Sequence, residues 1–332
     1  MHSVTALSTL AFATGALAGF DPSSINNVAT YWGQNSAGGA TTQSNLTTYC
    51  EDPNIDIIPM AFLNEVKKPG LNLGNVGDTC ASFPSGLIHC PNVGEDIKTC
   101  QDKGKTIILS IGGATYTEGG FASEQEAIAS AENIWSVFGP DAGDGVERPF
   151  DDAFVNGFDL DFEAPVTNMV AFANRMRELM NEAEGDFYIT AAPQCPFPDQ
   201  NNNEMLNGAV DFDIVWVQFY NNYCGLDAFA GGNSPGGYNF ETWDNWAKNA
   251  SSNPNVKVMT GAPAAPSAAG SGYVDASTLA EVIEYSKQFS SFGGVMMWDV
   301  SQAYANPGFL DTVKGALSSG FKRAMRRGMR LS

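Results

Sequence analysis

The chain has 332 residues, and 37 acidic against 17 basic side chains give it a formal net charge of −20 at pH 7. This charge argues against nucleic-acid partners, because an acidic surface repels phosphates. After the first residues, no stretch is apolar for long enough to cross a bilayer, so we expect no membrane association. The length fits one α/β barrel, a fold that often exceeds the average domain size.

Residues 1–18 are interpreted as a signal peptide. They hold no acidic or basic residue apart from His2, run apolar around Leu10 and end in Ala16-Leu17-Ala18. An apolar segment followed by small residues three and one positions before a cleavage site is typical of secretory signals. We therefore expect cleavage before Gly19 and a secreted, extracellular protein.

From residue 28 onward, short apolar runs rich in β-branched and aromatic residues recur, each followed by a longer segment. Eight of them are predicted as strands: 28–32, 55–62, 105–111, 158–163, 187–192, 214–219, 256–260 and 295–298. Apolar residues at helical spacing predict helices between some of these strands, at 169–180 and at 276–285, where Ser277 is the expected N-cap. Pro59 conflicts with the second strand, because proline cannot donate a ladder hydrogen bond.

Apolar strands that alternate with helices indicate a parallel sheet covered by helices. Eight such units in this length predict an α/β fold, a single (β/α)8 TIM barrel over residues 19–318. No linker or repeat divides the chain, so we expect one domain. We also expect the protein to be a monomer.

Six cysteines in a secreted chain predict three disulfides that tie down loops, because an oxidising compartment favours them. Spacing alone leaves the pairing open. One arrangement nests Cys80–Cys90 inside Cys50–Cys100, which would close one long loop region, and leaves Cys195–Cys224 as the third pair.

Two further features concern the surface and the chain end. Asn45 and Asn249 each begin an Asn-x-Ser/Thr sequence, which is a glycosylation site in an exported protein. Residues 319–332 hold a cluster of five basic side chains. We interpret this cluster as a disordered or processed tail rather than a binding site.

Several kinds of active site lack the residues they need. His89 is the only histidine after the predicted cleavage site, which leaves almost no material for a Ser-His-Asp triad or a histidine zinc site. The Gly-x-Ser-x-Gly pattern at 232–236 follows a loop, and Pro235 has no N–H for an oxyanion hole, so it is predicted as a turn. No phosphate-binding glycine loop follows a strand. We expect neither a metal nor a cofactor.

The fourth predicted strand holds acids at every second position, Asp159, Asp161 and Glu163. Side chains of a strand alternate between two faces, so the acids share one face and the apolar residues between them share the other. In a barrel the apolar face fits the helices and the acids point inward. Buried like charges cannot all stay ionised, so at least one pKa must rise and a proton is shared.

Proteins accept such an arrangement mainly at functional sites. The alternatives are a half-exposed strand with its acids facing water and a cation site built from carboxylate oxygens. The barrel context favours catalysis over both, and the absence of a glycine at the turn position disfavours a calcium loop.

The active site of a TIM barrel lies at the carboxyl ends of its strands. Trp298 ends the last predicted strand and is a candidate substrate-binding residue, the alternative being an ordinary core tryptophan. Tyr31, Phe62, Gly113 and Gln218 are candidates to line the cleft by the same placement, although barrel strands also hold many aromatic and small core residues.

Residues 156–163, Asn-Gly-Phe-Asp-Leu-Asp-Phe-Glu, resemble the Asp-Gly-x-Asp-x-Asp-x-Glu signature of glycoside hydrolase family 18, the chitinases. The chain departs from this signature at Asn156, the position farthest from the terminal acid. Further segments are similar to the fungal and plant class III, or hevamine-like, chitinases: 31–35, 61–64, 110–113, 191–199, 217–222 and 293–298. Together they extend over nearly all of the mature chain.

The resemblance implies a retaining endochitinase-type enzyme that cuts β-1,4 bonds between N-acetylglucosamine units with help from the substrate's own acetamide. Glu163 is then the acid and base, and Asp161 orients the acetamide. Asp159 holds the shared proton, Tyr220 hydrogen-bonds the acetamide oxygen, and Trp298 forms the floor beneath the sugar. Chitin or its oligosaccharides are the expected partners.

Two other functions stay open at this point. An endo-N-acetylglucosaminidase acting on N-glycans would use the same acid and acetamide, but the hevamine-like segments speak against it. A catalytically inactive carbohydrate-binding or inhibitor protein on the same barrel would have lost the acid, whereas Glu163, Asp161 and Tyr220 are all present.

Overall fold

The computed structural model describes residues 19–232 and 236–318. The predicted signal peptide at 1–18 and the predicted basic tail at 319–332 lie outside the described residues, as do residues 233–235 of the predicted turn. Within the described part, no helix combines the length and the apolar character that crossing a membrane requires.

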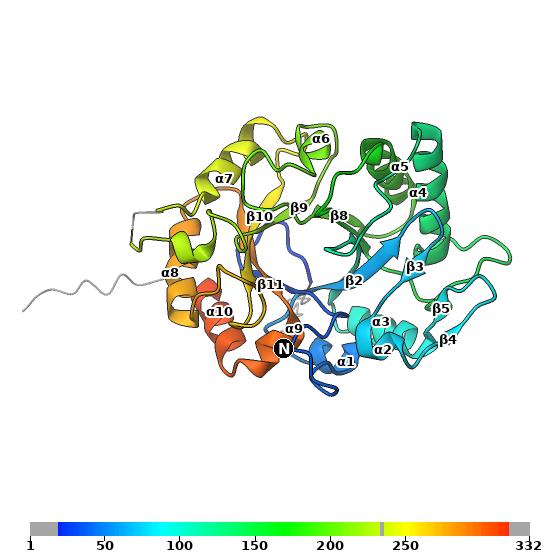
Figure 1. The fold of residues 1–332 in the computed structure, drawn as a ribbon, viewed down its shortest axis with the longest axis horizontal. Coiled ribbons are helices and arrows are strands. Elements are labelled where there is room, and N and C mark those ends of the chain that lie inside the picture. Colours follow the sequence, from blue (N-terminus) through cyan, green and yellow to red (C-terminus); the bar gives the residue numbers. More distant parts are fainter. Residues whose placement is uncertain (1–18, 233–235, 319–332) are drawn as a thin grey trace, which may run out of the picture.

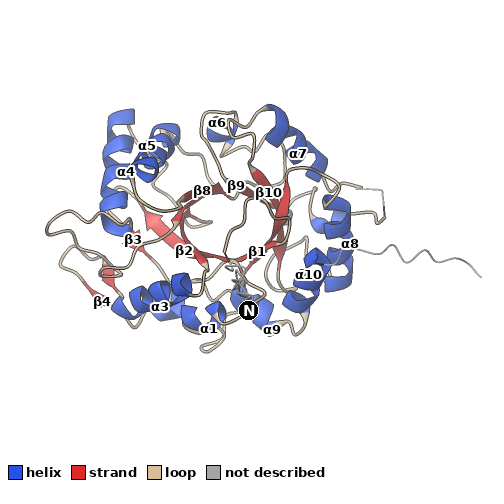
Figure 2. Cartoon of the chain, turned by 180° about the vertical axis from the view of Figure 1, so that it is seen from behind, coloured by secondary structure: helices blue, strands red, loops and turns tan. Residues whose placement is uncertain are grey.

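Eight parallel strands close into a barrel that helices surround (Figures 1 and 2). The strands are β1 Asn27–Thr30, β2 Ile57–Glu65, β6 Thr106–Gly112, β7 Gly157–Asp161, β8 Tyr188–Ala191, β9 Ile214–Gln218, β10 Lys257–Pro263 and β11 Phe292–Trp298. Each pairs with its neighbour in this order, and β1 pairs with both β11 and β2, which closes the ring. The predicted TIM barrel and its eight predicted strands are confirmed.

The remaining elements lie outside this ring. Strand β3, Gly70–Leu71, pairs antiparallel with β2, and β4, Ala81–Ser82, pairs with β5, Ile88–His89. The helices are α1 Leu46–Cys50, α2 Gly74–Gly77, α3 Pro91–Asp102, α4 Glu124–Phe138, α5 Met169–Glu182, α6 Asn203–Leu206, η1 Leu226–Ala228, α7 Phe240–Asn249, α8 Ala276–Ser286, α9 Val300–Ala305 and α10 Phe309–Ser318.

Helices α5 and α8 confirm the two predicted helices, but the predicted N-cap of α8 is wrong by two residues. Asp275, not Ser277, caps the helix: its carboxylate accepts a hydrogen bond of 2.8 Å from the backbone N–H of Thr278. The Ser277 hydroxyl donates to the same carboxylate at 2.6 Å. A charged carboxylate is a good cap because it also interacts favourably with the positive end of the helix dipole.

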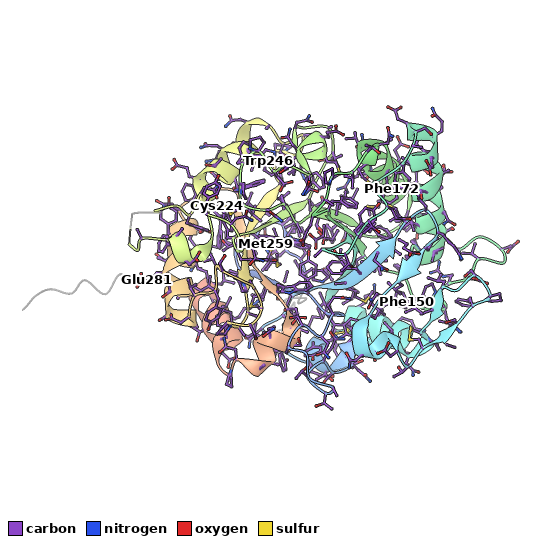
Figure 3. All side chains as sticks on the ribbon, viewed as in Figure 1. Phe150, Phe172, Cys224, Trp246, Met259 and Glu281 are labelled. Atoms are coloured by element: carbon purple, nitrogen blue, oxygen red, sulfur yellow. A yellow bond between two sulfur atoms is a disulfide. The ribbon has the colours of Figure 1, made fainter. Side chains whose placement is uncertain are left out.

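Alternation along the strands divides the buried side chains into two clusters. The outer cluster lies between strands and helices and includes Phe158 of β7 and Phe172 of α5. The inner cluster fills the barrel and includes Trp216, Met259 and Met296. Figure 3 shows Met259 near the middle of the barrel and Phe172 among the surrounding helices. The apolar face of β7 therefore packs on helices, as the sequence predicts.

Pro59 lies in β2, at the point where the barrel closes. Its carbonyl accepts a hydrogen bond of 2.9 Å from the backbone N–H of Trp32, so its donorless nitrogen also faces β1. The pairing of β1 with β2 is sparse there, with Ala29 opposite Ile57 and only an isolated bridge from Trp32. The missing donor is tolerated because it falls between the two neighbouring barrel strands that have the fewest paired residues.

The structure forms three disulfides, in the nested arrangement considered above. Cys50–Cys100 joins α1 to α3, Cys80–Cys90 closes a short loop beside it, and Cys195–Cys224 joins the loops that follow β8 and β9. The third bond lies next to the carboxyl ends of two barrel strands, so it helps to hold the loops on that face of the barrel, where ligands of this fold bind.

Gly294 in β11 should not tolerate a side chain. Its φ is +136°, and a Cβ atom there would lie 1.9 Å from the carbonyl oxygen of Asn27 on β1. We expect Gly294→Ala to lower the free energy of unfolding by more than about 2 kcal/mol, because backbone strain adds to a steric clash that neighbouring strands cannot relieve. Denaturant unfolding followed by circular dichroism measures the change.

Gly315→Ala is the matched control, since a Cβ at this exposed position of α10 would meet no atom within 4 Å. In a helix interior this replacement should raise stability by roughly 0.5–1 kcal/mol. Equal losses of stability in both variants would contradict the role assigned to Gly294.

Candidate active site

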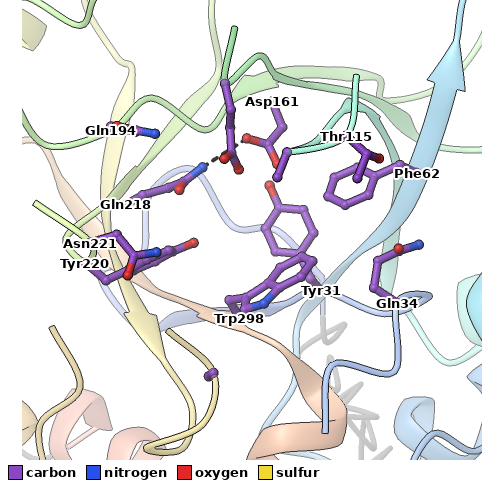
Figure 4. Close-up of a pocket in the computed structure, with 13 residues that line it drawn as sticks. Tyr31, Gln34, Phe62, Thr115, Asp161, Gln194, Gln218, Tyr220, Asn221 and Trp298 are labelled. Atoms are coloured by element: carbon purple, nitrogen blue, oxygen red, sulfur yellow. Dashed lines mark hydrogen bonds between the residues drawn. The ribbon is translucent and has the colours of Figure 1, made fainter. Parts of the chain in front are cut away.

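A pocket opens at the carboxyl ends of the barrel strands, and every one of the eight strands or the loop after it contributes to the lining (Figure 4). Seven lining residues are ones the sequence singles out: Tyr31, Phe62, Asp161, Glu163, Gln218, Tyr220 and Trp298. Six others are not predicted: Gln34, Ala114, Thr115, Gln194, Asn221 and Ala268. The predicted residues Asp159 and Gly113 lie behind this lining.

The acids of β7 follow the predicted alternation. Asp159 and Asp161 belong to the strand, with 0% and 3% of their surface exposed, whereas Phe158 and Leu160 pack in the outer cluster. Glu163 lies two residues beyond the end of β7, is only partly buried and lines the pocket. The three carboxyl groups thus form a series from the barrel interior to the pocket.

Asp159 is the innermost acid and is held by three hydroxyl donors. The hydroxyl groups of Tyr31 and Ser110 each donate to its Oδ2 at 2.6 Å, and that of Thr190 donates to its Oδ1 at 2.8 Å. The Tyr31 oxygen in turn accepts a hydrogen bond of 2.9 Å from the indole N–H of Trp216. Neutral donors from three strands or their ends therefore satisfy a carboxylate that has no cationic partner among the described residues.

Asp161 receives a hydrogen bond from the side-chain amide of Gln218 on β9. The Gln218 Nε2 donates to Oδ1 of Asp161 at 3.0 Å and to the carbonyl of Ala192 at 3.0 Å, which fixes the orientation of the amide. Gln218 was predicted to line the cleft from its place alone. The structure shows in addition that Gln218 contacts Asp161 directly and is its amide hydrogen-bond donor (Figure 4).

Burial is the main reason why the pKa values of all three acids rise above their ordinary values. It raises the pKa of Asp161 well above the usual range, and repulsion from Glu163 and Asp159 adds to this. Burial also raises the pKa of Asp159, although hydrogen bonds from Ser110, Tyr31 and Thr190 oppose the shift, and it raises the pKa of Glu163. The series therefore retains protons at a pH where ordinary carboxyl groups have lost theirs.

Aromatic rings form one wall of the pocket. The rings of Phe62 and Trp298 stack with their centroids 5.9 Å apart, and Tyr31 packs against Trp298 at 5.4 Å. Gly113 does not line the pocket, but a Cβ atom there would lie 2.8 Å from the Phe62 ring. Its contribution is to leave room for that ring.

Tyr220 follows β9 and is 8% exposed. Burial raises its pKa well above the ordinary value, and the charges of Asp161 and Glu163 raise it further, so the hydroxyl stays a donor. The loop after β10 fixes its backbone: Asn221 Oδ1 accepts hydrogen bonds from the N–H groups of Gly270 and Ser271. Gly272, with a φ of +93°, approaches so closely that a Cβ would lie 2.6 Å from the Tyr220 Cα.

The loop after β8 is organised by one buried carboxylate. Asp199 accepts hydrogen bonds from the backbone N–H groups of Gln194, Asn201 and Asn202 and from the Asn202 amide. The same Asn202 amide donates to the carbonyl of Phe162 at 3.0 Å. This network joins the loop that holds Gln194 to the segment between Asp161 and Glu163.

Asp299 does the same for the end of β11. It is fully buried directly after Trp298, and its carboxylate accepts hydrogen bonds from the N–H groups of Ser36 and Gln302 and from the Ser301 hydroxyl. It therefore connects the pocket tryptophan to the loop after β1.

Asn156, where the chain departs from the family signature, is remote from the pocket. Its Oδ1 accepts hydrogen bonds from the N–H of Ile107 at 2.9 Å and from the Gln101 amide at 3.0 Å. This residue supports the start of β7 at the other end of the strand, so the change from aspartate does not touch the acids.

The chemistry of the lining favours a neutral polar substrate. Among the described residues that line the pocket there is no lysine or arginine, and the described part of the chain contains no cluster of His, Cys, Asp and Glu arranged to hold a metal ion. A carboxyl group at the pocket surface with a raised pKa can donate a proton. The acids beneath it can stabilise a positive charge that develops above them.

Some of the residues that the sequence did not predict had a detectable signal. Gln34, Thr115, Gln194 and Asn221 all follow the ends of barrel strands within a few residues, where lining positions are expected. Ala268 had no such signal, because it lies in the long loop after β10 and only the folded path of that loop brings it to the pocket.

Comparison with known proteins agrees with this geometry. The profile of the family "Glycosyl hydrolases family 18" matches residues 27–271. A class III chitinase of the fungus Arthroderma benhamiae is 54% identical over 320 residues, covering 94% of this chain and 91% of the relative.

Two solved structures are similar in fold and differ in what they are named for. A chitinase from Ipomoea carnea superposes with a TM-score of 0.72 and 29% identity, covering 87% of this chain and 99% of that one. A xylanase and amylase inhibitor protein superposes with the same TM-score of 0.72 and 28% identity, covering 87% and 98%. Shape alone therefore does not separate hydrolysis from inhibition, and the site residues must do so.

Asp161→Asn should make the protein more stable at neutral pH. The folded-state pKa of Asp161 is raised, so its contribution to stability is present while the carboxyl is protonated and is lost as the pH rises through that value. Asparagine cannot ionise and still accepts the Gln218 hydrogen bond. We expect the melting temperature at pH 7 to rise by about 2 °C or more, with the gain shrinking as the pH falls through the raised pKa and vanishing below the ordinary pKa of aspartate.

Asp275→Asn supplies the opposite sign. Hydrogen bonds from Ser277 lower the pKa of this exposed cap, so its contribution is present above the ordinary pKa and is lost as the pH falls. Its melting temperature at pH 7 should not rise. A lower melting temperature for Asp161→Asn at pH 7 would contradict the burial argument.

Proposed function

The chain belongs to glycosyl hydrolase family 18, and on this premise we propose that it is a secreted, retaining chitinase that cleaves β-1,4 bonds between N-acetylglucosamine units. The observation that supports this most directly is the carboxyl series. Glu163, whose pKa is raised by burial, faces a pocket directly above Asp161 and Asp159. Such a series provides one proton donor and a negatively charged environment beneath it.

In the first step Glu163 donates its proton to the glycosidic oxygen as the bond from that oxygen to the anomeric carbon breaks. The carbonyl oxygen of the substrate's acetamide forms the new bond to the anomeric carbon, which gives an oxazolinium ion. Water then attacks the same carbon from the face that the leaving group vacated, the bond from this carbon to the acetamide oxygen breaks so that the acetamide is regenerated, and Glu163 takes up a proton from the water. Two inversions retain the anomeric configuration.

Asp161 and Tyr220 are proposed to hold the acetamide for this attack. Asp161 would accept a hydrogen bond from the acetamide N–H and stabilise the positive charge of the oxazolinium ion. The raised pKa of Tyr220 supports its role, because only the protonated hydroxyl can donate to the acetamide oxygen. Because the nucleophile is part of the substrate and is held in place, the reaction avoids the loss of translational and rotational entropy that an external nucleophile would cost.

Asp159 is proposed to hold the proton that the two inner carboxyl groups share. Three hydroxyl donors and complete burial keep Asp159 fixed while the Asp161 carboxyl is proposed to turn between Asp159 and Glu163. Tyr31 would act through its hydrogen bond to Asp159, besides lining the pocket.

Trp298, stacked with Phe62, offers a flat apolar surface beneath the sugar whose acetamide reacts.

The inhibitor-like function receives less support. A protein that only binds carbohydrate or another protein does not need a series of buried carboxyl groups. Keeping such a series lowers the stability of the fold, because burial removes ionised groups from water. The presence of Asp159, Asp161, Glu163 and Tyr220 in one connected arrangement therefore favours hydrolysis.

Secretion is proposed from the predicted signal peptide together with the disulfides. Three cystines form in the structure, as expected in an oxidising compartment. The sequon residues Asn45 and Asn249 are both exposed, which glycosylation requires.

Glu163→Gln tests the acid directly. We expect the kcat for chitin oligosaccharides to fall by about 10²–10⁴-fold or more, because glutamine cannot donate a proton, while the dissociation constant stays close to that of the unmodified protein. Reducing-end assays and calorimetry measure the two effects.

Because burial raises the pKa of Glu163, activity of the unmodified protein should also persist to a higher pH than an ordinary glutamic acid would allow.

Glu124→Gln, on the exposed first turn of α4, is the control for the same chemical change and should leave kcat unaltered. Substantial turnover by Glu163→Gln would refute the assignment of the acid.

Removal of the acetyl group from the reacting sugar tests the nucleophile. Chitin oligosaccharides deacetylated at that one unit should resist cleavage there, because no protein carboxylate replaces the missing acetamide. Mass spectrometry of the products locates the bonds that are cut. Equal cleavage next to acetylated and deacetylated units would mean that a protein group attacks the anomeric carbon instead.

A further inference from the structure

Two exposed aromatic side chains lie within three residues of residues that line the pocket. Large hydrophobic side chains that are exposed within the described residues are Ile25, Ile128, Phe197, Tyr223 and Tyr304. Phe197 and Tyr223, exposed to 42% and 75%, follow or precede by one or two residues the cysteines of the Cys195–Cys224 disulfide, next to the pocket residues Gln194 and Asn221. The other three lie on other segments of the chain, whereas Phe197 and Tyr223 flank the two cysteines of one disulfide. Exposed apolar side chains that are held together can mark a binding surface.

The backbone under Tyr223 is fixed on both sides. Cys224 is fully buried in its disulfide, and the Asn222 amide donates a hydrogen bond of 3.1 Å to Oε1 of Gln194. Asn221 is held in turn by the backbone N–H groups of Gly270 and Ser271. Tyr223 has the most exposed aromatic ring in the described part of the chain. The disulfide holds the backbone on one side of it, and the hydrogen bonds of Asn221 and Asn222 hold it on the other.

Phe197 is supported from below. Its ring meets the ring of buried Trp243 edge to face, with centroids 5.2 Å apart, and leaves its remaining surface to solvent. The Trp243 indole N–H donates to the carbonyl of Cys195 at 3.1 Å, which connects this support to the same disulfide. Both rings are therefore presented by one rigid unit, the Cys195–Cys224 loop pair.

The position of this unit fits a chain that leaves the pocket. Figure 4 shows Phe62, Thr115 and Gln34 on one side of the pocket and Gln194 and Asn221 on the opposite side. A polymer that enters past the first group and lies over the acids continues past the second. Tyr223 is two residues from Asn221, and Phe197 is three residues from Gln194.

We propose that Tyr223, together with Phe197 on the other loop of the Cys195–Cys224 pair, forms an aromatic subsite that binds sugar units of the polysaccharide beyond the pocket. This inference rests on the proposed function, since it takes the same β-1,4-linked chain as its ligand. The axial C–H faces of a pyranose ring are apolar and match the face of an aromatic ring, and stacking removes both surfaces from water. Because the backbone is already rigid, binding the sugar costs less conformational entropy.

Tyr223→Ala tests the subsite through the dependence of rate on substrate length. The measured quantity is the ratio of kcat/KM for the hexamer of N-acetylglucosamine to kcat/KM for the trimer, because a subsite beyond the pocket favours the longer substrate. We expect this ratio to fall about threefold to tenfold, the range of one aromatic contact. Tyr223→Phe keeps the ring and should keep the ratio.

Tyr304→Ala removes another exposed tyrosine, exposed to 44% on α9, and should also keep the ratio. A ratio in Tyr223→Ala equal to that of the unmodified protein would overturn the subsite and leave the proposed function standing. Failure of the unmodified protein to cleave any oligomer would overturn both. A concentration-dependent dimer that only Tyr223→Ala abolishes, seen by gel filtration together with an unchanged ratio, would assign the rings to self-association instead.

Discussion

The interior of this barrel buries Asp159 and Asp161 with Glu163 above them, and the described residues that line the pocket above these acids include no lysine or arginine. Desolvation and mutual repulsion therefore set the properties of the site. The protein meets this constraint with neutral donors: hydroxyls of Tyr31, Ser110 and Thr190 for Asp159 and the Gln218 amide for Asp161 in the pocket. Without cations, the acids keep their tendency to hold protons, which is the property that acid catalysis needs.

The same constraint explains why the surrounding loops are so firmly connected. A carboxyl series works only if its members keep their spacing, and side chains on strands are more precisely placed than side chains on loops. Asp159 and Asp161 are on β7, but Glu163 lies beyond its end. The Asp199 network, the Asp299 network and the Cys195–Cys224 disulfide compensate by joining the loops to one another at this face. One rigid rim results, which also holds the exposed rings of the proposed aromatic subsite.

Most of the fold and the centre of the site follow from periodicity. Alternation in residues 158–163 placed the acids inside and the apolar residues on the helices, and this needed no knowledge of other strands. The features that sequence did not give depend on contacts between distant segments. Gly113 acts by leaving room for Phe62, and Ala268 reaches the pocket only through the path of its loop. The cap of α8 is a local exception, because aspartate and serine are both good capping residues and only the backbone geometry decides that Asp275 caps the helix.

The central claim is that the substrate's own acetamide attacks and that Glu163 serves twice, once as acid and once as base. The anomeric configuration of the first products tests it most directly. A defined hexamer of N-acetylglucosamine can be followed by proton NMR within the first minutes, before mutarotation mixes the anomers. The account predicts that the new reducing ends appear as the β-anomer. Initial formation of the α-anomer would mean a single displacement by water and would contradict it.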